Sequence, residues 1–224
     1  KGVKRGMVFS NINGTRLKRD NYRDLLYNQT SNSYTVKFSQ ISYNQNNQCA
    51  NIIPGQEDIT LVKSRIVKNP IHISKIIEIQ GQKVGYLMYN QFVGVVESEG
   101  KDYNSELNNV FSNFLSNGIN DLVVDLRYNP GGRISTSINL ASMITGQFNN
   151  QVFAKERWNS KLMNYWDDNS PESLLNRFTN KLSNNESIFS LNLDRVFVLT
   201  SSRTASASEL LINGLTPHID IIQI

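Results

Sequence analysis

Apolar and polar positions alternate at residues 34–39, with the period of a half-buried β-strand. Two further short strands are predicted at residues 7–12 and 59–62. The strand at residues 7–12 ends at Asn13-Gly14, a pair typical of tight hairpin turns. These patterns predict a small β-rich unit.

Two other stretches separate the predicted strands of this unit. Asp20 is a suitable cap for a short helix that contains Tyr22, Leu25 and Leu26. Residues 44–55 contain an Asn/Gln-rich run and a Pro-Gly pair, and we expect a surface loop there. The pair at residues 69–70, Asn-Pro, marks the predicted boundary, so the first unit is expected to span residues 1–68.

The remaining chain, residues 69–224, has a different pattern, in which apolar segments typical of strands alternate with segments typical of amphipathic helices. Strands are predicted at residues 84–92, 121–126, 196–200 and 219–224. Helices are predicted at residues 104–117, 134–144 and about 205–215. Strand, loop and helix repeated in this order imply a mainly parallel sheet with helices on its faces, and therefore an α/β fold.

Composition and charge exclude several classes of protein. With 39% hydrophobic and 19% charged residues, the chain is expected to fold, and no apolar run approaches the roughly 18 residues of a membrane-spanning helix. Cys49 is the only cysteine, and His72 and His218 lie far apart in the sequence, so we predict no disulfide, no metal site and no cofactor. The net charge is +6 over residues 1–66, but basic and apolar residues alternate there, so nucleic-acid binding is not predicted.

Two loops of the predicted sheet carry the candidate chemistry, because loops at the carboxyl ends of parallel strands gather reactive groups. One loop is Asn-Pro-Gly-Gly at residues 129–132, and the other, residues 201–209, contains Ser206. A serine at the start of a helix lies in positive potential beside free backbone N–H groups, which can bind the oxyanion formed when a carbonyl is attacked. Gly131 or Gly132 would let a second backbone donor approach the substrate closely.

Each motif also has a purely structural interpretation. Ser206 and Glu209 have the spacing of a capping box, and Asn-Pro-Gly-Gly is most often a turn. Trp158, Trp166 and Tyr89 could line a substrate cleft, although packing is the commoner role of such side chains. Spacing alone leaves these alternatives open.

The two motifs together, in this order, resemble the S41 peptidases, the C-terminal-processing or tail-specific proteases. Residues 121–132 are similar to a strand and loop of that family, residues 204–209 to its nucleophile motif, and residues 85–92 to the strand that opens its catalytic core. Residues 2–14 resemble the middle of a PDZ domain. The resemblance implies a ClpP/crotonase-like α/β core over residues 69–224, incomplete at its C-terminal end, after a partial PDZ-like domain over residues 1–68.

The resemblance also implies roles for particular residues. The nucleophile falls on Ser206, and the oxyanion donors fall on the backbone of Ala207 and of Gly131 and Gly132. The family's general base is a lysine, expected beyond Ile224, so residues 1–224 alone are expected to be inactive. A rival base within the chain would be His72 or His218, which match no catalytic motif of the family.

The activity implied by the resemblance is that of a serine endopeptidase. It would hydrolyse flexible or C-terminal protein segments through an acyl-enzyme, in the periplasm or cell envelope, with or without a lipid anchor upstream of Lys1. A polypeptide substrate is the expected partner, and the sequence does not define the oligomeric state. One alternative is a catalytically inactive peptide-binding module on a protease-like fold. Another is a crotonase-like enzyme for acyl thioesters, for which nothing marks a coenzyme A site.

Overall fold

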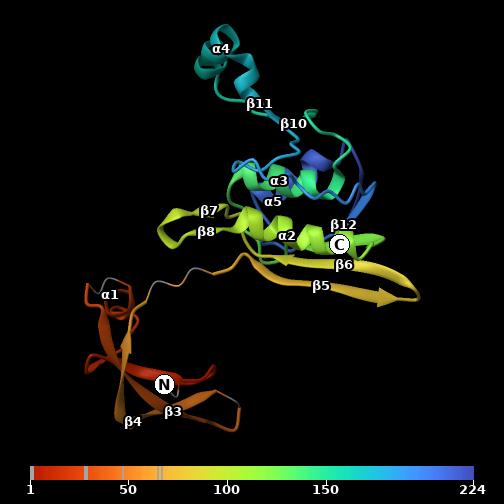
Figure 1. The fold of residues 1–224 in the computed structure, drawn as a ribbon. Helices are drawn as coiled ribbons and strands as arrows, with labels where there is room; N and C mark the ends of the chain where they lie inside the picture. The colour runs from red at the N-terminus through yellow and green to blue at the C-terminus, as the bar shows by residue number, and fades with distance from the viewer. Residues whose placement is uncertain (1–2, 28–29, 47, 65, 67) are drawn as a thin grey trace. The chain divides into compact units, whose positions relative to one another are not determined.

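The computed structural model describes residues 3–27, 30–46, 48–64, 66 and 68–224 (Figure 1). The chain divides into two compact units, Lys1–Val67 and Lys68–Ile224. Each unit has its own sheet.

The first unit is an antiparallel sheet in the order β2-β1-β3-β4, with one short helix. Its elements are β1 (Val8–Ile12), β2 (Thr15–Arg16), α1 (Tyr22–Leu26), β3 (Ser33–Tyr43) and β4 (Cys49–Val62). Asn13 and Gly14 join β1 to β2 with φ of 47° and 74°, as a primed hairpin turn requires. Ile12 and Val36 pair across β1 and β3 and are both buried. The identity of this unit as a PDZ domain stays a prediction.

Two local predictions for this unit are wrong. The predicted loop over residues 44–55 is a turn only at its start, and β4 runs through Pro54. Pro54 pairs with Ser39 beside a bulge in β4, whose preceding pair is Lys37 and Asp58, and β4 is an edge strand, where proline is tolerated. The helix cap is Asn21 rather than Asp20, and the side chain of Asn21 instead accepts a hydrogen bond from Lys18 N at 2.7 Å.

The second unit is built on a five-stranded sheet in the order β13-β12-β9-β6-β5. Its strands are β5 (Ile71–Ile79), β6 (Gln82–Tyr89), β9 (Asp121–Asp125), β12 (Arg195–Leu199) and β13 (Asp220–Gln223). The pairs β13·β12, β12·β9 and β9·β6 are parallel, and β5 runs antiparallel to β6. The predicted mainly parallel α/β fold is therefore confirmed, although the edge strand β5 was not predicted.

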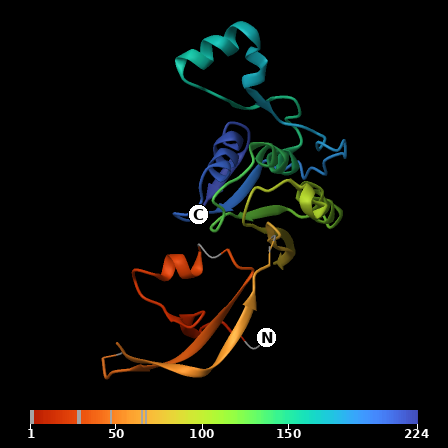
Figure 2. The ribbon, with the colours of Figure 1, turned by 90° about the vertical axis from the view of Figure 1, so that its left-hand side faces the viewer.

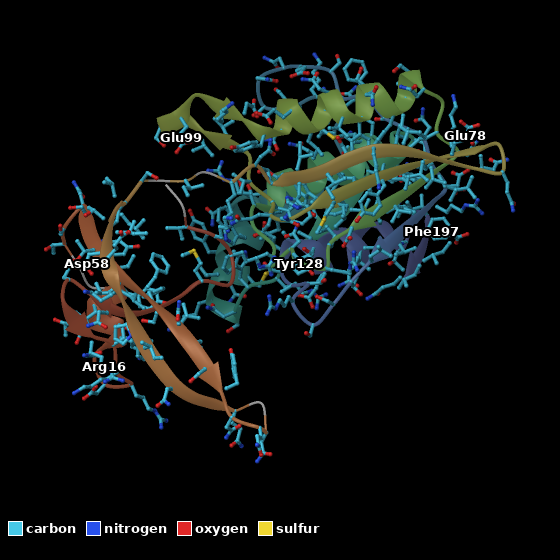
Figure 3. All side chains as sticks on the ribbon, turned by 90° about the horizontal axis from the view of Figure 1, so that it is seen from below. Arg16, Asp58, Glu78, Glu99, Tyr128 and Phe197 are labelled. Atoms are coloured by element: carbon cyan, nitrogen blue, oxygen red, sulfur yellow. The ribbon has the colours of Figure 1, made fainter. Side chains whose placement is uncertain are left out.

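Three helices cover one face of this sheet (Figures 1 and 2). They are α2 (Tyr103–Ser116), α3 (Ile134–Thr145) and α5 (Ala207–Leu215). Alternate strand residues pack beneath them in one core, among them Leu87, Leu122, Val124, Val196 and Val198. The intervening residues, such as Phe197 on β12, lie on the opposite face (Figure 3).

Smaller elements complete the second unit. They are β7 (Val95–Val96), η1 (Glu97–Glu99), β8 (Lys101–Asp102), β10 (Val152–Lys155), α4 (Ser160–Asn169), η2 (Pro171–Leu174) and β11 (Leu175–Arg177). The segment around Trp158 and Trp166, for which the sequence predicted no element, contains α4 and η2.

Helix α5 lies so close to β10 that only glycine fits at position 214. A Cβ on Gly214 would lie 2.8 Å from Cδ2 of the buried Phe153. We expect Gly214→Ala to lower the free energy of unfolding by about 1–3 kcal/mol through overpacking, although alanine is the better helix former by about 1 kcal/mol. Urea denaturation checks this. The exposed neighbour Asn213 provides the control, because Asn213→Ala is expected to stay within about 0.5 kcal/mol of the wild type. Equal stability of both variants would contradict the packing argument.

Candidate active site

The two candidate loops leave the same edge of the sheet, because β9 and β12 are adjacent and parallel. Side chains of the second loop hold the first. Ser201 Oγ donates to Arg127 O, and Thr204 Oγ1 donates to Leu126 O at 2.8 Å. The two loops are therefore held together before any substrate binds.

Asn129 lies at the centre of this arrangement and is completely buried. Its Nδ2 donates to Tyr89 O at 2.9 Å, at the end of β6, and its Oδ1 accepts from Gly131 N at 2.8 Å. Its carbonyl accepts from Ser208 Oγ at 3.1 Å and from Ala205 N at 3.3 Å. One residue thus fixes the glycine loop, the end of β6 and the start of α5.

Ser206 is exposed and lies against the glycine loop. A Cβ built on Gly131 would lie 2.6 Å from Ser206 Cβ and 2.9 Å from Ala207 N. Gly131 and Gly132 have φ of 105° and 146°, a backbone that favours glycine. The structure therefore brings the predicted residues Ser206, Ala207 and Gly131 together.

The backbone donors beside Ser206 are not equivalent. The N–H of Gly131 is already bound by Asn129 Oδ1. Within the described part of the chain, no acceptor is paired with the N–H of Gly132 or of Ala207. These two N–H groups therefore remain open to an acceptor, a distinction between Gly131 and Gly132 that the sequence did not make, and their role as oxyanion donors stays a prediction.

Ser206 is also a helix cap, as the structural interpretation of the motif required. It forms a capping box with Glu209, whose Oε2 accepts from Ser206 N at 2.7 Å. The backbone of Ser206, however, has φ 58° and ψ −117°, whereas Asp102 and Asn159, which cap α2 and α4, have ordinary extended backbones. Capping therefore does not explain the conformation of Ser206. A backbone of this kind costs on the order of 1–3 kcal/mol and persists only where the surrounding structure enforces it. Strain of this kind is typical of a nucleophile on a sharp strand-to-helix turn.

The other candidate side chains lie apart from Ser206 or belong to the core. His218 follows the opposite end of α5, with Nε2 3.3 Å from Val152 O and its ring packed on Phe148 and Phe178. Tyr89 is fully buried in the core, and Trp166 packs on Tyr165 within α4. Trp158 is exposed.

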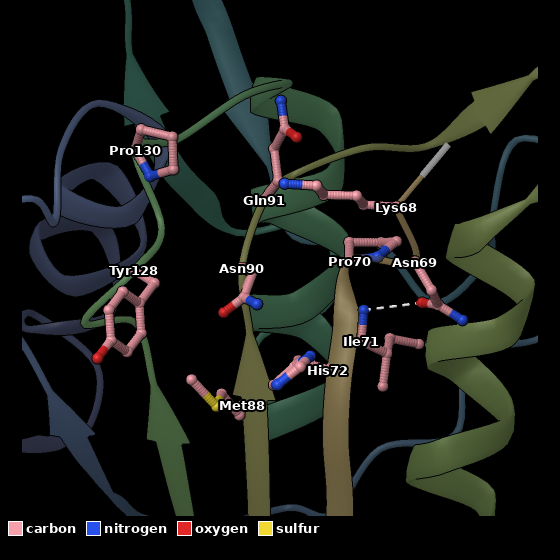
Figure 4. A pocket seen from close by; sticks show the side chains of 10 residues that line it. All are labelled: Lys68, Asn69, Pro70, Ile71, His72, Met88, Asn90, Gln91, Tyr128 and Pro130. Carbon is pink, nitrogen blue, oxygen red and sulfur yellow. Dashed lines mark hydrogen bonds between the residues drawn. The ribbon is translucent and has the colours of Figure 1, made fainter. Parts of the chain in front are cut away.

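A pocket of about 990 Å³ opens beside the glycine loop (Figure 4). Ten residues line it, from the start of β5 and the segment before it, the end of β6 and the segment after it, and the loop after β9: Lys68, Asn69, Pro70, Ile71, His72, Met88, Asn90, Gln91, Tyr128 and Pro130. Asn90 Oδ1 is buried and has no hydrogen-bond partner among the described residues. Sequence reasoning missed this site because one wall is the unpredicted strand β5.

An ion pair supports the first loop from the open face of the sheet. Asp125 is 1% exposed, and its carboxylate accepts from Arg127 Nη2 and from Tyr86 Oη, each at 2.7 Å. Burial opposes the charged carboxylate, but the hydrogen bonds from Arg127 and Tyr86 prevail and hold the pKa of Asp125 below its usual value. Burial, followed by the bond to Asp125, raises the pKa of Tyr86.

This ion pair predicts a pH-dependent contribution to stability. Because the pKa of Asp125 is lower in the folded state, its contribution is present above the unfolded pKa of about 3.9 and is lost as the pH falls through the lowered value. Arg127→Met should lower Tm at pH 7 by about 3–6 °C, and the difference from the wild type should shrink as the pH falls below about 4. Thermal unfolding followed by circular dichroism at several pH values measures this.

Arg195 provides a matched control for Arg127. Its guanidinium binds Asp121 at 2.6 and 2.9 Å, but this pair is more exposed. Exposed pairs contribute little, so Arg195→Met should change Tm less than Arg127→Met does. Equal decreases in Tm for the two variants would contradict the role of the buried carboxylate. So would a Tm difference between Arg127→Met and the wild type that stays constant with pH.

Among the described residues, no three His, Cys, Asp or Glu side chains are grouped as metal ligands. No helix in the described ranges has both the length and the apolar character needed to cross a bilayer.

Comparison with known proteins identifies the family. The model of peptidase family S41 matches residues 83–218, which include both loops and Ser206. A solved structure from Bacteroides fragilis, described as a candidate S41 protease, is 28% identical with a TM-score of 0.62, and the match covers 99% of this chain and 54% of that one. A photosystem II D1 C-terminal processing protease is 18% identical with a TM-score of 0.47, and the match covers 96% of this chain and 50% of that one. No curated protein matches.

The chain thus spans about half the length of these two solved proteins. The family match runs from β6 past the end of α5, which is well over half of the chain. The chain therefore belongs to peptidase family S41, as its two sequence motifs indicated.

Proposed function

We propose that the protein is a serine endopeptidase that hydrolyses flexible or C-terminal segments of other proteins through an acyl-enzyme on Ser206. The observation that carries this proposal is the conformation of Ser206, which is exposed, strained and in contact with Gly131. The family match supports a peptidase activity. The neighbouring Ser208 is buried and bonded to Asn129 O, so it is the weaker candidate for the nucleophile.

The proposed reaction begins when Ser206 Oγ attacks the scissile carbonyl carbon and gives its proton to a general base. The negative oxygen of the tetrahedral intermediate accepts hydrogen bonds from the N–H groups of Ala207 and Gly132. The C–N bond then breaks, the base returns the proton to the leaving amine, and water hydrolyses the resulting ester. The N-terminus of α5 adds positive potential at the oxyanion.

We propose that the general base is a lysine that the complete protein supplies from outside residues 1–224, as the family resemblance implies. The hydrogen bonds of the described residues include none between Ser206 and a lysine or histidine. Burial among apolar groups lowers the pKa of a lysine and leaves it neutral enough to accept the serine proton. The resemblance further implies a substrate bound as an added β-strand and a location in the periplasm or cell envelope.

Hydrolysis of an unfolded protein by the full-length enzyme tests this proposal. Casein and a folded protein with a flexible C-terminal tail are incubated with the enzyme, and the products are identified by mass spectrometry. We expect internal peptide bonds of casein and of the tail to be cleaved, while the folded body stays intact. Binding of the tail without any cleavage would instead support the alternative, an inactive peptide-binding module.

A further inference from the structure

The pocket beside the glycine loop is connected to the candidate active site through the backbone. Phe92 N donates to Gly131 O at 2.9 Å, and Arg133 N donates to Phe92 O at 2.8 Å. Gln91 and Pro130, which line the pocket, directly precede Phe92 and Gly131. Successive residues of an extended peptide are about 3.3 Å apart, so a peptide with its carbonyl at Ser206 could place a nearby side chain in this pocket.

The lining of the pocket favours a negatively charged group. It includes Lys68 and His72, and none of the ten described residues that line it is an aspartate or a glutamate. Figure 4 shows the Lys68 side chain crossing one end of the pocket toward Gln91, with Tyr128 on the side of the glycine loop. The ammonium group of a charged lysine only donates hydrogen bonds, so the charge and the donors of Lys68 both suit a carboxylate.

The pocket also contains an acceptor that needs a donor. Asn90 Oδ1 is buried and has no partner among the described residues, and a buried unsatisfied polar atom is costly. Because this oxygen has no exposed surface, a peptide N–H would satisfy it once the Asn90 side chain turns toward the pocket. An acidic peptide offers both groups, the N–H for Asn90 and the carboxylate for Lys68.

We propose that this pocket is a substrate subsite that selects a peptide carboxylate next to the scissile bond, with Lys68 as the specificity-determining residue. This inference rests on the proposed peptidase function and specifies its substrate class. The carboxylate can come from an acidic side chain or from the C-terminus of the substrate.

Peptide binding to the full-length Ser206→Ala variant tests the subsite without turnover. Fluorescent peptides that carry Glu or the uncharged Gln beside the cleaved bond are compared by anisotropy, each with a free or an amidated C-terminus. We expect the Glu peptide to bind about threefold more tightly than the Gln peptide. If the C-terminus is the source of the carboxylate, amidation instead weakens binding by about the same factor.

Two lysine variants make the test specific. Lys68→Met should abolish the preference for the carboxylate, and Lys68→Glu should reverse it. Lys75→Met is the control and should leave the preference unchanged. Lys75 is on β5 but does not line the pocket, and its Nζ lies 5.5 Å from the ring centroid of Tyr86 on β6.

The outcomes separate this inference from the proposed function. If the wild-type enzyme cleaves casein but Ser206→Ala binds all peptides equally, the subsite is wrong and the peptidase function stands. If the preference depends on Lys68 but the wild type cleaves nothing, the pocket binds a peptide carboxylate through Lys68, and the peptidase function is wrong. A preference that persists in Lys68→Met would overturn the assignment of Lys68.

Discussion

Replacing Ser206 with alanine is expected to lower kcat for casein hydrolysis by at least about 10³-fold, because the variant lacks the oxygen that forms the acyl-enzyme. The fold should be retained, since Ser206 is exposed and its backbone N–H can still bind Glu209 Oε2. Steady-state kinetics on the full-length protein measure the loss, and circular dichroism confirms the fold.

Ser208 is the matched control for this substitution. It lies two residues further on, in the first turn of α5, but is buried and donates to Asn129 O. Ser208→Ala should lower the free energy of unfolding by about 1 kcal/mol through the lost hydrogen bond, and kcat should fall by no more than about tenfold. Full activity of Ser206→Ala together with an inactive Ser208→Ala would show that Ser208 is the nucleophile and that the assignment of Ser206 is wrong.

Replacing Gly131 with alanine is expected to have the second largest effect, a loss of about 10²–10³-fold in kcat. The added Cβ would overlap Ser206 Cβ and crowd Ala207 N, so the nucleophile and one oxyanion donor would both move. A displacement of about 1 Å at a reacting group is enough for a loss of about 10²-fold. Kinetics of the full-length variant measure the effect.

Gly100→Ala separates steric overlap from backbone strain. Gly100 also has a positive φ, 59°, but a Cβ there would meet no atom within 4 Å. Both substitutions should destabilise the protein by about 1–2 kcal/mol through the left-handed backbone, but Gly100→Ala should keep its activity. Similar losses of activity in the two variants would contradict the geometric role of Gly131.

The sequence predicted the parallel sheet and its helices because their apolar residues repeat with clear periods. Residues 104–117 and 121–126 match α2 and β9 within about one residue at each end. Edge strands were harder to predict. The side chains of β5 remain largely exposed, and β4 contains Pro54, so neither strand has the pattern of a buried one.

The sequence predicted which residues form the candidate site, but not their backbone conformation or their hydrogen bonds. Ser206 and the glycine loop could be named from two motifs in order, because serine and paired glycine have distinctive roles. The backbone conformation of Ser206 and the hydrogen bonds of Asn129 to Tyr89, Gly131, Ala205 and Ser208 depend on how β6, β9 and α5 meet, which residue types alone do not encode. For the same reason, the sequence could not show that Gly131 N–H is already bound.

The most direct test of the account is to identify the serine that reacts. The full-length protein is treated with a peptide phosphonate, a reagent that forms a stable bond with the nucleophile of a serine peptidase, and the modified residue is mapped by tandem mass spectrometry. The account predicts a single adduct on Ser206 that is absent from Ser206→Ala and still forms on Ser208→Ala. An adduct on Ser208 or on any other residue would contradict it.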